Sequence, residues 1–410
     1  MNIGIFTETY KPNINGVVTS IEIKKRELEK LGHKVYIIAP YEPEYEDREE
    51  NVIRLKSFVL VFQPEYRLAY PPMPHTIRLI RQLNLDIIHA ETPFSLGLIA
   101  AYMAKNEKIA FLHTYHTLFP EYVHYLKLPV TFTKKAAEKV SAAYCNMCNH
   151  IISPSIDVKN ELIRYGVKRP ITVVPTGIDN ANFSMESKED IREKFGIKKD
   201  EKVLIFVGRL GKEKNIDFLM DSFKILKDKR NEKIKLLLVG DGPYREQLIE
   251  KSKNLKIDKD VIFAGYVHRE EIAGYYKSAD IFVFSSLTET QGLVVLEAMA
   301  SSIPVVAVKA SGVEDMVVDG VSGYLTENLI EDFNDKIERM LDLDEERKEI
   351  IENGVLRAAE FSPEEIIKKL VEIYEQLIEE NNKKKMRKAL RFRRHRTLKA
   401  ITKIIRGTRA

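Results

Sequence analysis

The sequence lacks long apolar runs and is poor in cysteine. No run approaches the roughly 20 apolar residues that a membrane-spanning helix needs, and no basic segment precedes the first strand-like residues at Asn2. We therefore expect a cytoplasmic chain with neither a secretion signal nor a spanning helix. The only cysteines, Cys145 and Cys148, form a Cys-x-x-Cys pair with no second ligand pair nearby. This isolation favours inert thiols over a redox pair or half of a zinc site.

Positive charge is confined to one end of the chain. The formal net charge is +4, but residues 383–410 carry thirteen Lys or Arg and no acid, which leaves about −9 for the remainder. Apolar residues interrupt this basic tail, namely Met386, Leu390, Phe392, Leu398, Ile401, Ile404 and Ile405. Such segments bind anionic membrane leaflets, and each Lys or Arg contributes about 1 kcal/mol near the surface. Nucleic acid is the alternative partner. Because Phe392 is the only aromatic residue of the tail and the body is acidic, we expect a membrane surface and no nucleic acid.

Two series of strand-like and helix-like segments follow one another along the chain. β-branched runs such as NIGIFTE and KVYIIAP alternate with segments of helical periodicity, and the pattern starts again at KVLIFVG. Strands that are apolar on both faces and joined by helices predict parallel, doubly wound sheets. The fold class is therefore α/β, with two Rossmann-like domains, 1–175 and 176–362, facing a central cleft. We expect a hinge at VVPTGIDNANF, a closing helix over 363–382 and the basic tail over 383–410.

The stretch SSLTETQGLVVLEAMA carries two glutamates, Glu289 and Glu297, on either side of Gly292. Glu289 is expected on a loop at the carboxyl end of a strand, where ligands of such sheets bind, and Glu297 about one turn into a helix. The first amides of that helix would form an anion site between the two carboxylates. A diphosphate flanked by hydroxyl groups is a nucleotide sugar. The spacing alone equally allows a capped helix with solvated acids.

Two other strand-end segments point to the same ligand. FVGRLGKEKNID presents Arg209 and Lys214, which suit the negative charge that grows on a departing phosphate. ETYKPNINGVVTS places Gly16 at the start of a helix, where its amide is available to the same phosphates. This segment is not a Gly-x-Gly-x-x-Gly fingerprint, which argues against a dinucleotide cofactor. Taken singly, solvated surface cations and a plain strand-to-helix turn explain these segments as well.

Together these motifs resemble the retaining glycosyltransferases of the two-domain GT-B architecture, in the family-4 group that includes bacterial lipid glucosyl- and mannosyltransferases. The resemblance covers about residues 2–375. It rests on the Glu-x7-Glu motif ETQGLVVLE, on GRLGKEKNID, on GDGP at 240–243, on HTYHT at 113–117 and on the NGVVTS opening. The combination in this order is specific, whereas any one motif alone is weak.

The resemblance implies roles for the donor-side residues. Glu289 would lie beside the hydroxyl groups of the donor hexose, and Glu297 would hold the ribose hydroxyls. The amides near Gly292 and Leu293 would help to seat the sugar. Retention of configuration would follow without a protein nucleophile, because the acceptor hydroxyl attacks from the face that the phosphate leaves and a phosphate oxygen takes its proton.

The resemblance also assigns the cations and a histidine. Arg209 and Lys214 would stabilise the leaving diphosphate, with help from the Gly16 amide. His116 matches the histidine that the family places at the acceptor side of the sugar, and His113 is less favoured. A lone strand-end histidine is otherwise more often structural.

No metal or other cofactor is expected beyond the nucleotide-sugar substrate. Two Asp-x-Asp matches, DKD at 258–260 and DLD at 342–344, resemble the metal-binding motif of glycosyltransferases with the other large fold. The first precedes a strand, at the wrong end for ligands, and the second ends a helical run. We interpret both as solvated turns.

Other segments indicate the acceptor. RLAYPPMPHTIRLIRQLN at 67–84 sets Arg78 and Arg81 among apolar residues in the half that binds acceptors in this family, although an ordinary surface helix explains it too. NIGIFTETYKPNINGVV and HTYHTLFPEYVHY are most similar to the diacylglycerol glucosyltransferases. This similarity implies transfer of glucose from UDP-glucose to the 3-hydroxyl of 1,2-diacylglycerol in an α linkage, by an enzyme bound peripherally to the inner face of the cell membrane.

Two alternatives remain open. The same fold could use another acceptor, such as phosphatidylinositol, a polyprenyl-linked oligosaccharide or a soluble sugar, or a GDP-mannose donor. The chain could instead be a catalytically silent sugar-nucleotide binder that docks on membranes through its tail. The presence of both glutamates, Arg209 and Lys214 argues against the silent binder.

Overall fold

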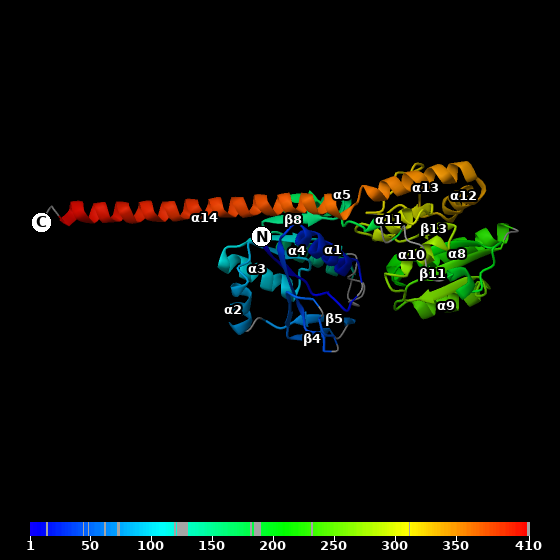
Figure 1. Ribbon diagram of the computed structural model, residues 1–410, viewed down its shortest axis with the longest axis horizontal. Coiled ribbons are helices and arrows are strands. Elements are labelled where there is room, and N and C mark those ends of the chain that lie inside the picture. Colours follow the sequence, from blue (N-terminus) through cyan, green and yellow to red (C-terminus); the bar gives the residue numbers. More distant parts are fainter. Residues whose placement is uncertain are drawn as a thin grey trace.

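Two parallel sheets, one in each half of the chain, form the body of the molecule (Figure 1). The structure is a computed structural model that describes residues 1–407 except 14, 44, 48, 61–62, 72–73, 119, 121–129, 181–182, 184–189, 231–232 and 311. Side chains are not described at 60, 63–66, 130–133, 388–389 and 391–407.

The first sheet has seven strands in the order β3-β2-β1-β6-β7-β8-β9. Their bounds are β1 (Asn2–Phe6), β2 (Lys34–Pro40), β3 (Val52–Leu55), β6 (Ile87–Ala90), β7 (Ala110–Thr114), β8 (His150–Ser153) and β9 (Ile171–Val173). All neighbouring pairs are parallel. Ile5, Ile37 and Ile87 are fully buried, as expected for strands covered on both faces.

Helices connect these strands, and an additional hairpin lies beside the sheet. The helices are α1 (Gly16–Lys30), α2 (Pro74–Gln82), α3 (Ser95–Glu107), α4 (Val130–Cys145) and α5 (Ile156–Tyr165). The hairpin pairs β4 (Ser57–Leu60) with β5 (Gln63–Ala69) in antiparallel fashion. Cys145 and Cys148 lie in the core as free thiols, and burial raises the pKa of Cys145 to about 12, as expected for inert cysteines.

The second sheet has six strands in the order β12-β11-β10-β13-β14-β15. Its elements are β10 (Lys202–Val207), β11 (Ile234–Val239), β12 (Val261–Gly265), β13 (Ile281–Phe284), β14 (Val305–Val308), β15 (Tyr324–Thr326), α7 (Ile191–Lys194), the 3-10 helix η2 (Lys212–Lys214), α8 (Ile216–Lys229), α9 (Arg245–Asn254), α10 (Ile272–Lys277), α11 (Leu293–Ala300), α12 (Ile330–Asp342) and α13 (Asp344–Ala359). All its ladders are parallel. The predicted α/β class with two Rossmann-like domains is confirmed.

Both sheets reverse their strand order beside their first strand. β1 lies between β2 and β6, and β10 lies between β11 and β13. Ligands of open α/β sheets bind at the carboxyl ends of the strands where the order reverses. The residues that directly follow β1, β6, β10 and β13 are therefore the first candidates for a site.

The chain crosses between the two domains twice, and the crossings lie side by side. The amide of Ile178 donates to the carbonyl of Phe361 over 3.0 Å. A Cβ at Gly177 would lie 2.9 Å from the Cα of Pro363, which leaves room for glycine alone. The hinge segment is thus packed directly against the return crossing.

After the second crossing, α14 (Pro363–Gly407) returns over the first domain and extends well past it (Figure 1). Its first part contacts α1 and β7, and Tyr374 is fully buried there. The helix continues past residue 382. The ion pairs Glu379–Lys383 and Glu380–Lys384 have i,i+4 spacing, which is favourable within a helix, and they bridge this position. Within the described part of the chain, no helix is both long and apolar enough to cross a bilayer.

Candidate active site

The switch point of the second sheet brings two of the predicted motifs together. The Nζ atom of Lys214, at the end of η2, lies 2.5 Å from Oε1 of Glu289, in the loop after β13. These side chains are only 16% and 14% exposed. The hydroxyl of Ser285 donates to the carbonyl of Lys214 and ties the two loops together. Arg209 lies in the same loop after β10 and is partly exposed.

The GDGP segment supports the loop that carries Arg209 and Lys214. A Cβ at Gly240 would lie 2.0 Å from the carbonyl oxygen of Gly208, and one at Gly242 would lie 2.5 Å from that of Leu210. Any side chain at these positions would displace the loop. The glycines of this motif thus allow the close approach that sets the position of the loop with the two cations.

Gly292 marks the start of α11. It occupies the N-cap position with φ 73° and has no side chain with which to cap the helix. Free amides at a helix start carry partial positive charge and bind anions. Leu293 follows Gly292 and faces the start of α1, since a Cβ at Gly16 would lie 3.8 Å from Leu293 Cδ1. The structure therefore brings Gly16, Gly292 and Leu293 together across the two domains.

Asn15 limits the number of backbone amides at the start of α1 that are available to a ligand. Its side-chain oxygen accepts hydrogen bonds of 3.0 Å from the amides of both Val17 and Val18. Asn15 is thus the N-cap of this helix. Only the Gly16 amide itself, of those in this turn, fits the predicted role toward a phosphate.

Glu297 lies inside α11 and is partly buried. Its Oε2 accepts a hydrogen bond of 3.0 Å from the hydroxyl of Tyr276. Burial raises the pKa of Glu297, and the nearby Arg269 and the Tyr276 hydrogen bond offset this only in part. Arg269 also donates to Thr19 Oγ1 of α1 over 2.9 Å. Glu297 therefore lies close to a contact between the domains.

A second contact between the domains passes through the hinge. The side chain of Gln291 accepts from the amide of Thr176 over 2.7 Å and donates to its carbonyl over 2.8 Å. The hydroxyl of Thr176 donates to Ser20 of α1 over 3.2 Å. The loop that precedes α11 is thereby fixed relative to the first domain.

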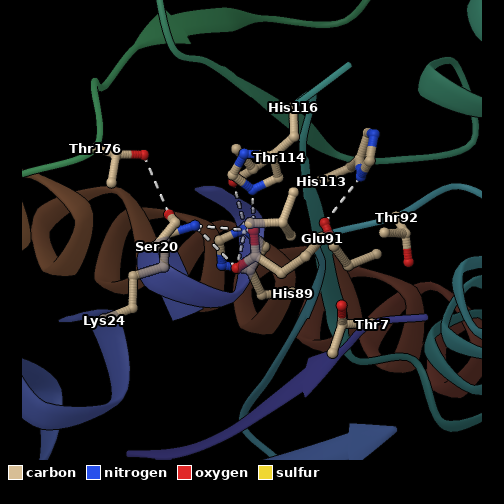
Figure 2. Close-up of polar contacts among 12 residues, drawn as sticks. Thr7, Ser20, Lys24, His89, Glu91, Thr92, His113, Thr114, His116 and Thr176 are labelled. Carbon is tan, nitrogen blue, oxygen red and sulfur yellow. Dashed lines mark hydrogen bonds and ion pairs between the residues drawn. The ribbon is translucent and has the colours of Figure 1, made fainter. Parts of the chain in front are cut away.

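The switch point of the first sheet holds a buried group of charged and ring side chains, which we call the Glu91 cluster: Lys24, His89, Glu91 and His116 (Figure 2). Glu91 directly follows β6, and its side chain is completely buried. Lys24 of α1 donates to Oε1 over 2.9 Å and to Oε2 over 2.8 Å. The Nε2 atom of His116 lies 2.7 Å from Glu91 Oε2.

The Glu91 cluster extends to the C-terminal helix. His89 Nε2 lies 3.5 Å from Glu91 Oε1 and 2.7 Å from Thr114 Oγ1. His89 Nδ1 is hydrogen-bonded with the hydroxyl of Tyr374 of α14 over 2.6 Å. The return of α14 over the first domain thus completes the surroundings of this cluster.

Burial sets the charges in the cluster. Burial opposes ionisation of Glu91, but His89, Lys24 and His116 more than offset it, so the pKa of Glu91 lies well below its ordinary value. Burial lowers the pKa of His116, and Glu91 opposes this only partly. Burial likewise lowers the pKa of His89 to about 3. The cluster therefore holds one carboxylate, one ammonium group and two neutral imidazoles at neutral pH.

His116 and His113 have different surroundings. His116 joins the Glu91 cluster, whereas His113 is hydrogen-bonded through Nδ1 to the carbonyl of Ala90 and packs edge-on against the ring of Tyr144. In Figure 2, the His113 ring points away from the cluster. The structure thus places His116, and not His113, beside ionised groups.

The lowered pKa of the buried His113 predicts a dependence of protein stability on pH. Burial lowers its pKa to about 4. Acidification below the unfolded value of about 6.5 therefore protonates the unfolded chain first, and stability is lost as the pH falls toward 4. Replacing His113 with phenylalanine keeps an aromatic ring and removes this titration.

We expect wild type to lose about 1 kcal/mol more stability than His113→Phe between pH 7 and pH 5.5, measured by urea unfolding at both pH values. The comparison cancels the other titrating groups, because both proteins share them. Equal pH dependence in the two proteins would show that His113 titrates normally.

The two Asp-x-Asp segments form ion pairs. Asp260 lies 2.6 Å from Lys227 and 3.0 Å from Lys235, and Asp342 lies 2.6 Å from Arg230. These aspartates serve as structural partners of basic residues. The acceptor segment EYVHY at 121–125 lies outside the described residues.

Sequence reasoning missed Glu91, Lys24, His89 and Tyr374. The signals were present for two of them. Glu91 directly follows the fully buried strand IIHA at its carboxyl end, and Lys24 shares the face of α1 that buries Ile21 and Leu28. A lysine on a buried helical face needs a buried carboxylate as partner.

Family models match both halves of the chain. Residues 14–182 match the model of the family "Glycosyltransferase Family 4", and residues 187–357 match that of "Glycosyl transferases group 1". Two proteins named alpha-monoglucosyldiacylglycerol synthase are similar. The one from Streptococcus pneumoniae is 38% identical over 79% of this chain and 75% of its own. The one from Acholeplasma laidlawii is 33% identical over 94% of this chain and 99% of its own.

Another relative and a solved structure complete the comparison. A GDP-mannose-dependent alpha-mannosyltransferase of Corynebacterium glutamicum is 30% identical over 79% of this chain and 76% of its own. The crystal structure of Anabaena Alr3699/HepE in complex with UDP and glucose has a TM-score of 0.74 at 18% identity, covering 91% of this chain and 99% of that one. The chain therefore belongs to the family-4 glycosyltransferases, and its fold is the two-domain GT-B architecture.

Proposed function

We propose that this glycosyltransferase moves glucose from UDP-glucose to the 3-hydroxyl of 1,2-diacylglycerol, with retention of configuration and an α linkage. The observation that carries the proposal is the pairing of Lys214 with Glu289, in the loop that leads to the start of α11. The names of the Streptococcus and Acholeplasma relatives support the acceptor and the sugar. UDP and glucose bound to the Anabaena protein support a nucleotide-sugar donor.

The donor would lie on the second domain. Its diphosphate would rest on the amides at Gly292 and Leu293, with Arg209 and Lys214 beside it. Glu289 would accept hydrogen bonds from the hexose, and Glu297 from the ribose. Lys214 can turn from Glu289 to the diphosphate without leaving its loop, which would free the carboxylate for the sugar hydroxyls.

The reaction needs charge stabilisation and exclusion of water more than it needs a protein nucleophile. The bond between the anomeric carbon and the phosphate oxygen breaks, and the acceptor oxygen bonds to the same face of that carbon. The acceptor proton passes to a phosphate oxygen of the leaving UDP. Arg209, Lys214 and the helix amides would stabilise the growing charge, while closure between the domains would limit hydrolysis. No metal is required in this scheme.

The outer surface of the first domain is suited to a lipid acceptor. The exposed side chains of Phe94, which precedes α3, and of Leu98 and Tyr102 on α3 follow one another at intervals of four residues and form an apolar stripe. Leu79 of α2 is also exposed, and Arg81 of α2 pairs with Glu107 of α3. Figure 1 shows both helices on the part of the molecule from which α14 projects. Apolar and basic groups on one side favour docking on the anionic inner face of the cell membrane.

The function is tested by thin-layer chromatography of the products formed with diacylglycerol in anionic-lipid vesicles. UDP-glucose, UDP-galactose and GDP-mannose are offered separately. We expect one new glycolipid, from UDP-glucose. A glycolipid from GDP-mannose alone would favour the mannosyltransferase alternative that the Corynebacterium relative suggests. No product from any donor, with the protein folded and bound to vesicles, would reject diacylglycerol as the acceptor.

Truncation of the chain after Asn382 tests whether the basic end of α14 binds the membrane. The described side chains near this point, such as Lys383 and Lys384, are exposed. Loss of the thirteen basic residues that follow is expected to weaken binding to anionic vesicles by at least on the order of 100-fold, measured by cosedimentation. UDP binding should be unchanged, because the donor half of the site is remote from this helix end. Equal vesicle binding by the truncated protein would contradict the role of the tail.

A further inference from the structure

The Glu91 cluster fixes the position of a proton on His116. An ionised carboxylate has no hydrogen to donate and can only accept. Glu91 is ionised, because it lies within 2.9 Å of the Lys24 ammonium group through both oxygens. The His116 Nε2 atom, 2.7 Å from Glu91 Oε2, must therefore carry the hydrogen of that contact.

A neutral imidazole with its hydrogen on Nε2 has a bare Nδ1. No hydrogen bond to Nδ1 of His116 occurs among the described residues, and the side chain keeps 10% of its surface exposed. Among the described residues, this nitrogen is thus a hydrogen-bond acceptor without a donor. It matches a hydroxyl group, which is the group that both a hexose and a diacylglycerol present.

We propose, on the basis of the proposed function, that Glu91 is a positioning residue that holds His116 in the Nε2–H tautomer, so that Nδ1 accepts a hydrogen bond from a substrate hydroxyl. The hydroxyl belongs either to the donor hexose or to the acceptor. Glu91 itself touches no substrate, because it is completely buried. Lys24 donates a hydrogen bond to each carboxylate oxygen of Glu91, and its positive charge keeps this carboxylate ionised.

The groups around His116 act in opposite senses on its protonation, since Glu91 favours it and the Lys24 charge opposes it. β6 contributes the neutral His89 and is followed directly by Glu91, α1 contributes Lys24, β7 contributes the neutral His113, and α14 contributes the Tyr374 hydroxyl, which is bonded to His89. The Lys24 charge disfavours a second proton on His116, as does burial, and Glu91 is already shared with Lys24. His116 therefore stays neutral at the pH of the reaction.

Nitrogen NMR of the histidine rings tests this proposal without any substrate, because ¹⁵N shifts distinguish the two neutral tautomers. The His116 signals are identified by their loss in His116→Phe. We expect the Nε2–H tautomer in wild type at pH 7. In Glu91→Gln, the amide oxygen goes to the Lys24 ammonium group and the amide NH₂ faces His116. Since NH₂ is a donor, the ring proton is expected to move to Nδ1.

Glu8→Gln is the matched control. Glu8 is a second buried carboxylate, which follows β1 and accepts hydrogen bonds from Thr92, Ser95 and the Leu96 amide. It does not contact His116, so this variant should keep the wild-type tautomer. An Nδ1–H or doubly protonated His116 in wild type, or an unchanged tautomer in Glu91→Gln, would overturn the proposal.

Kinetic measurements then show whether the hydroxyl that bonds to His116 belongs to the donor hexose or to the acceptor. Glu91→Gln is expected to lower kcat for transfer by on the order of 10- to 100-fold, with UDP affinity unchanged. If the bonded hydroxyl is on the hexose, hydrolysis of the donor in the absence of acceptor falls equally. If it is on the acceptor, hydrolysis is unaffected. Wild-type transfer in a Glu91→Gln protein with a moved proton would overturn the proposal. Absence of transfer in wild type would count against the proposed function alone.

Discussion

Replacing Lys214 with methionine is expected to lower kcat for glycolipid formation by on the order of 10²- to 10³-fold, which is typical for loss of one preorganised group at a developing negative charge. Lys214 is the cation that the structure places against Glu289 at the switch point of the second sheet. When the bond from the anomeric carbon to phosphate breaks, negative charge grows on the diphosphate. Methionine fills a similar volume but cannot stabilise this charge. Arg209 remains, so the loss should be partial.

The structure offers a matched control two residues away. Lys212 belongs to the same 3-10 helix, but it is exposed to solvent. Lys212→Met removes the same charge from the same loop and should keep a rate close to that of wild type. Equal losses in both variants would mean that Lys214 acts through the general charge of the loop. A Lys214→Met enzyme with more than a tenth of wild-type activity would contradict its role at the leaving group.

The positions of the candidate donor-side residues could be predicted because these residues lie in loops after apolar strands. The sequence run DIFVFSS is buried on both faces, so its end and the following Glu289 could be placed at one edge of a sheet. The same reasoning placed Arg209 and Lys214. Their mutual contact followed from topology, since β10 and β13 are neighbours in a doubly wound sheet.

Only His116 of the Glu91 cluster was singled out from the sequence, because the contacts of this cluster join distant elements. Glu91 meets Lys24 and His116 through the packing of α1 on β6 and β7, and no short motif encodes that packing. Tyr374 joins them from 285 residues further along the chain than His89. The continuation of α14 past residue 382 was also missed, since the basic composition of the tail suggested a separate segment although it contains no helix breaker before Gly407.

Replacing Lys24 with methionine is expected to destabilise the fold by about 3 kcal/mol at pH 7, because removal of one partner leaves a buried charge uncompensated. The Glu91 side chain is completely buried, and that of Lys24 is only 10% exposed. Methionine preserves most of the apolar volume of the lysine side chain, so the loss of stability reflects the removal of the charge. The measurement is urea-induced unfolding of the whole chain. Lys30→Met on the same helix is the control, because Lys30 is 58% exposed and its buried partner Glu27 keeps a second cation, Arg26, at 2.6 Å.

The pH dependence separates an electrostatic loss from a packing loss. In wild type the Lys24 charge helps to hold the pKa of Glu91 well below its ordinary value. Without Lys24, burial dominates and raises that pKa, so the folded variant takes up a proton on Glu91 more readily than the unfolded chain does. Acidification from pH 7 to pH 5 should therefore narrow the stability gap between wild type and Lys24→Met. A gap that is constant with pH would identify lost packing as the cause, and Glu91 would then not be the charge that Lys24 balances.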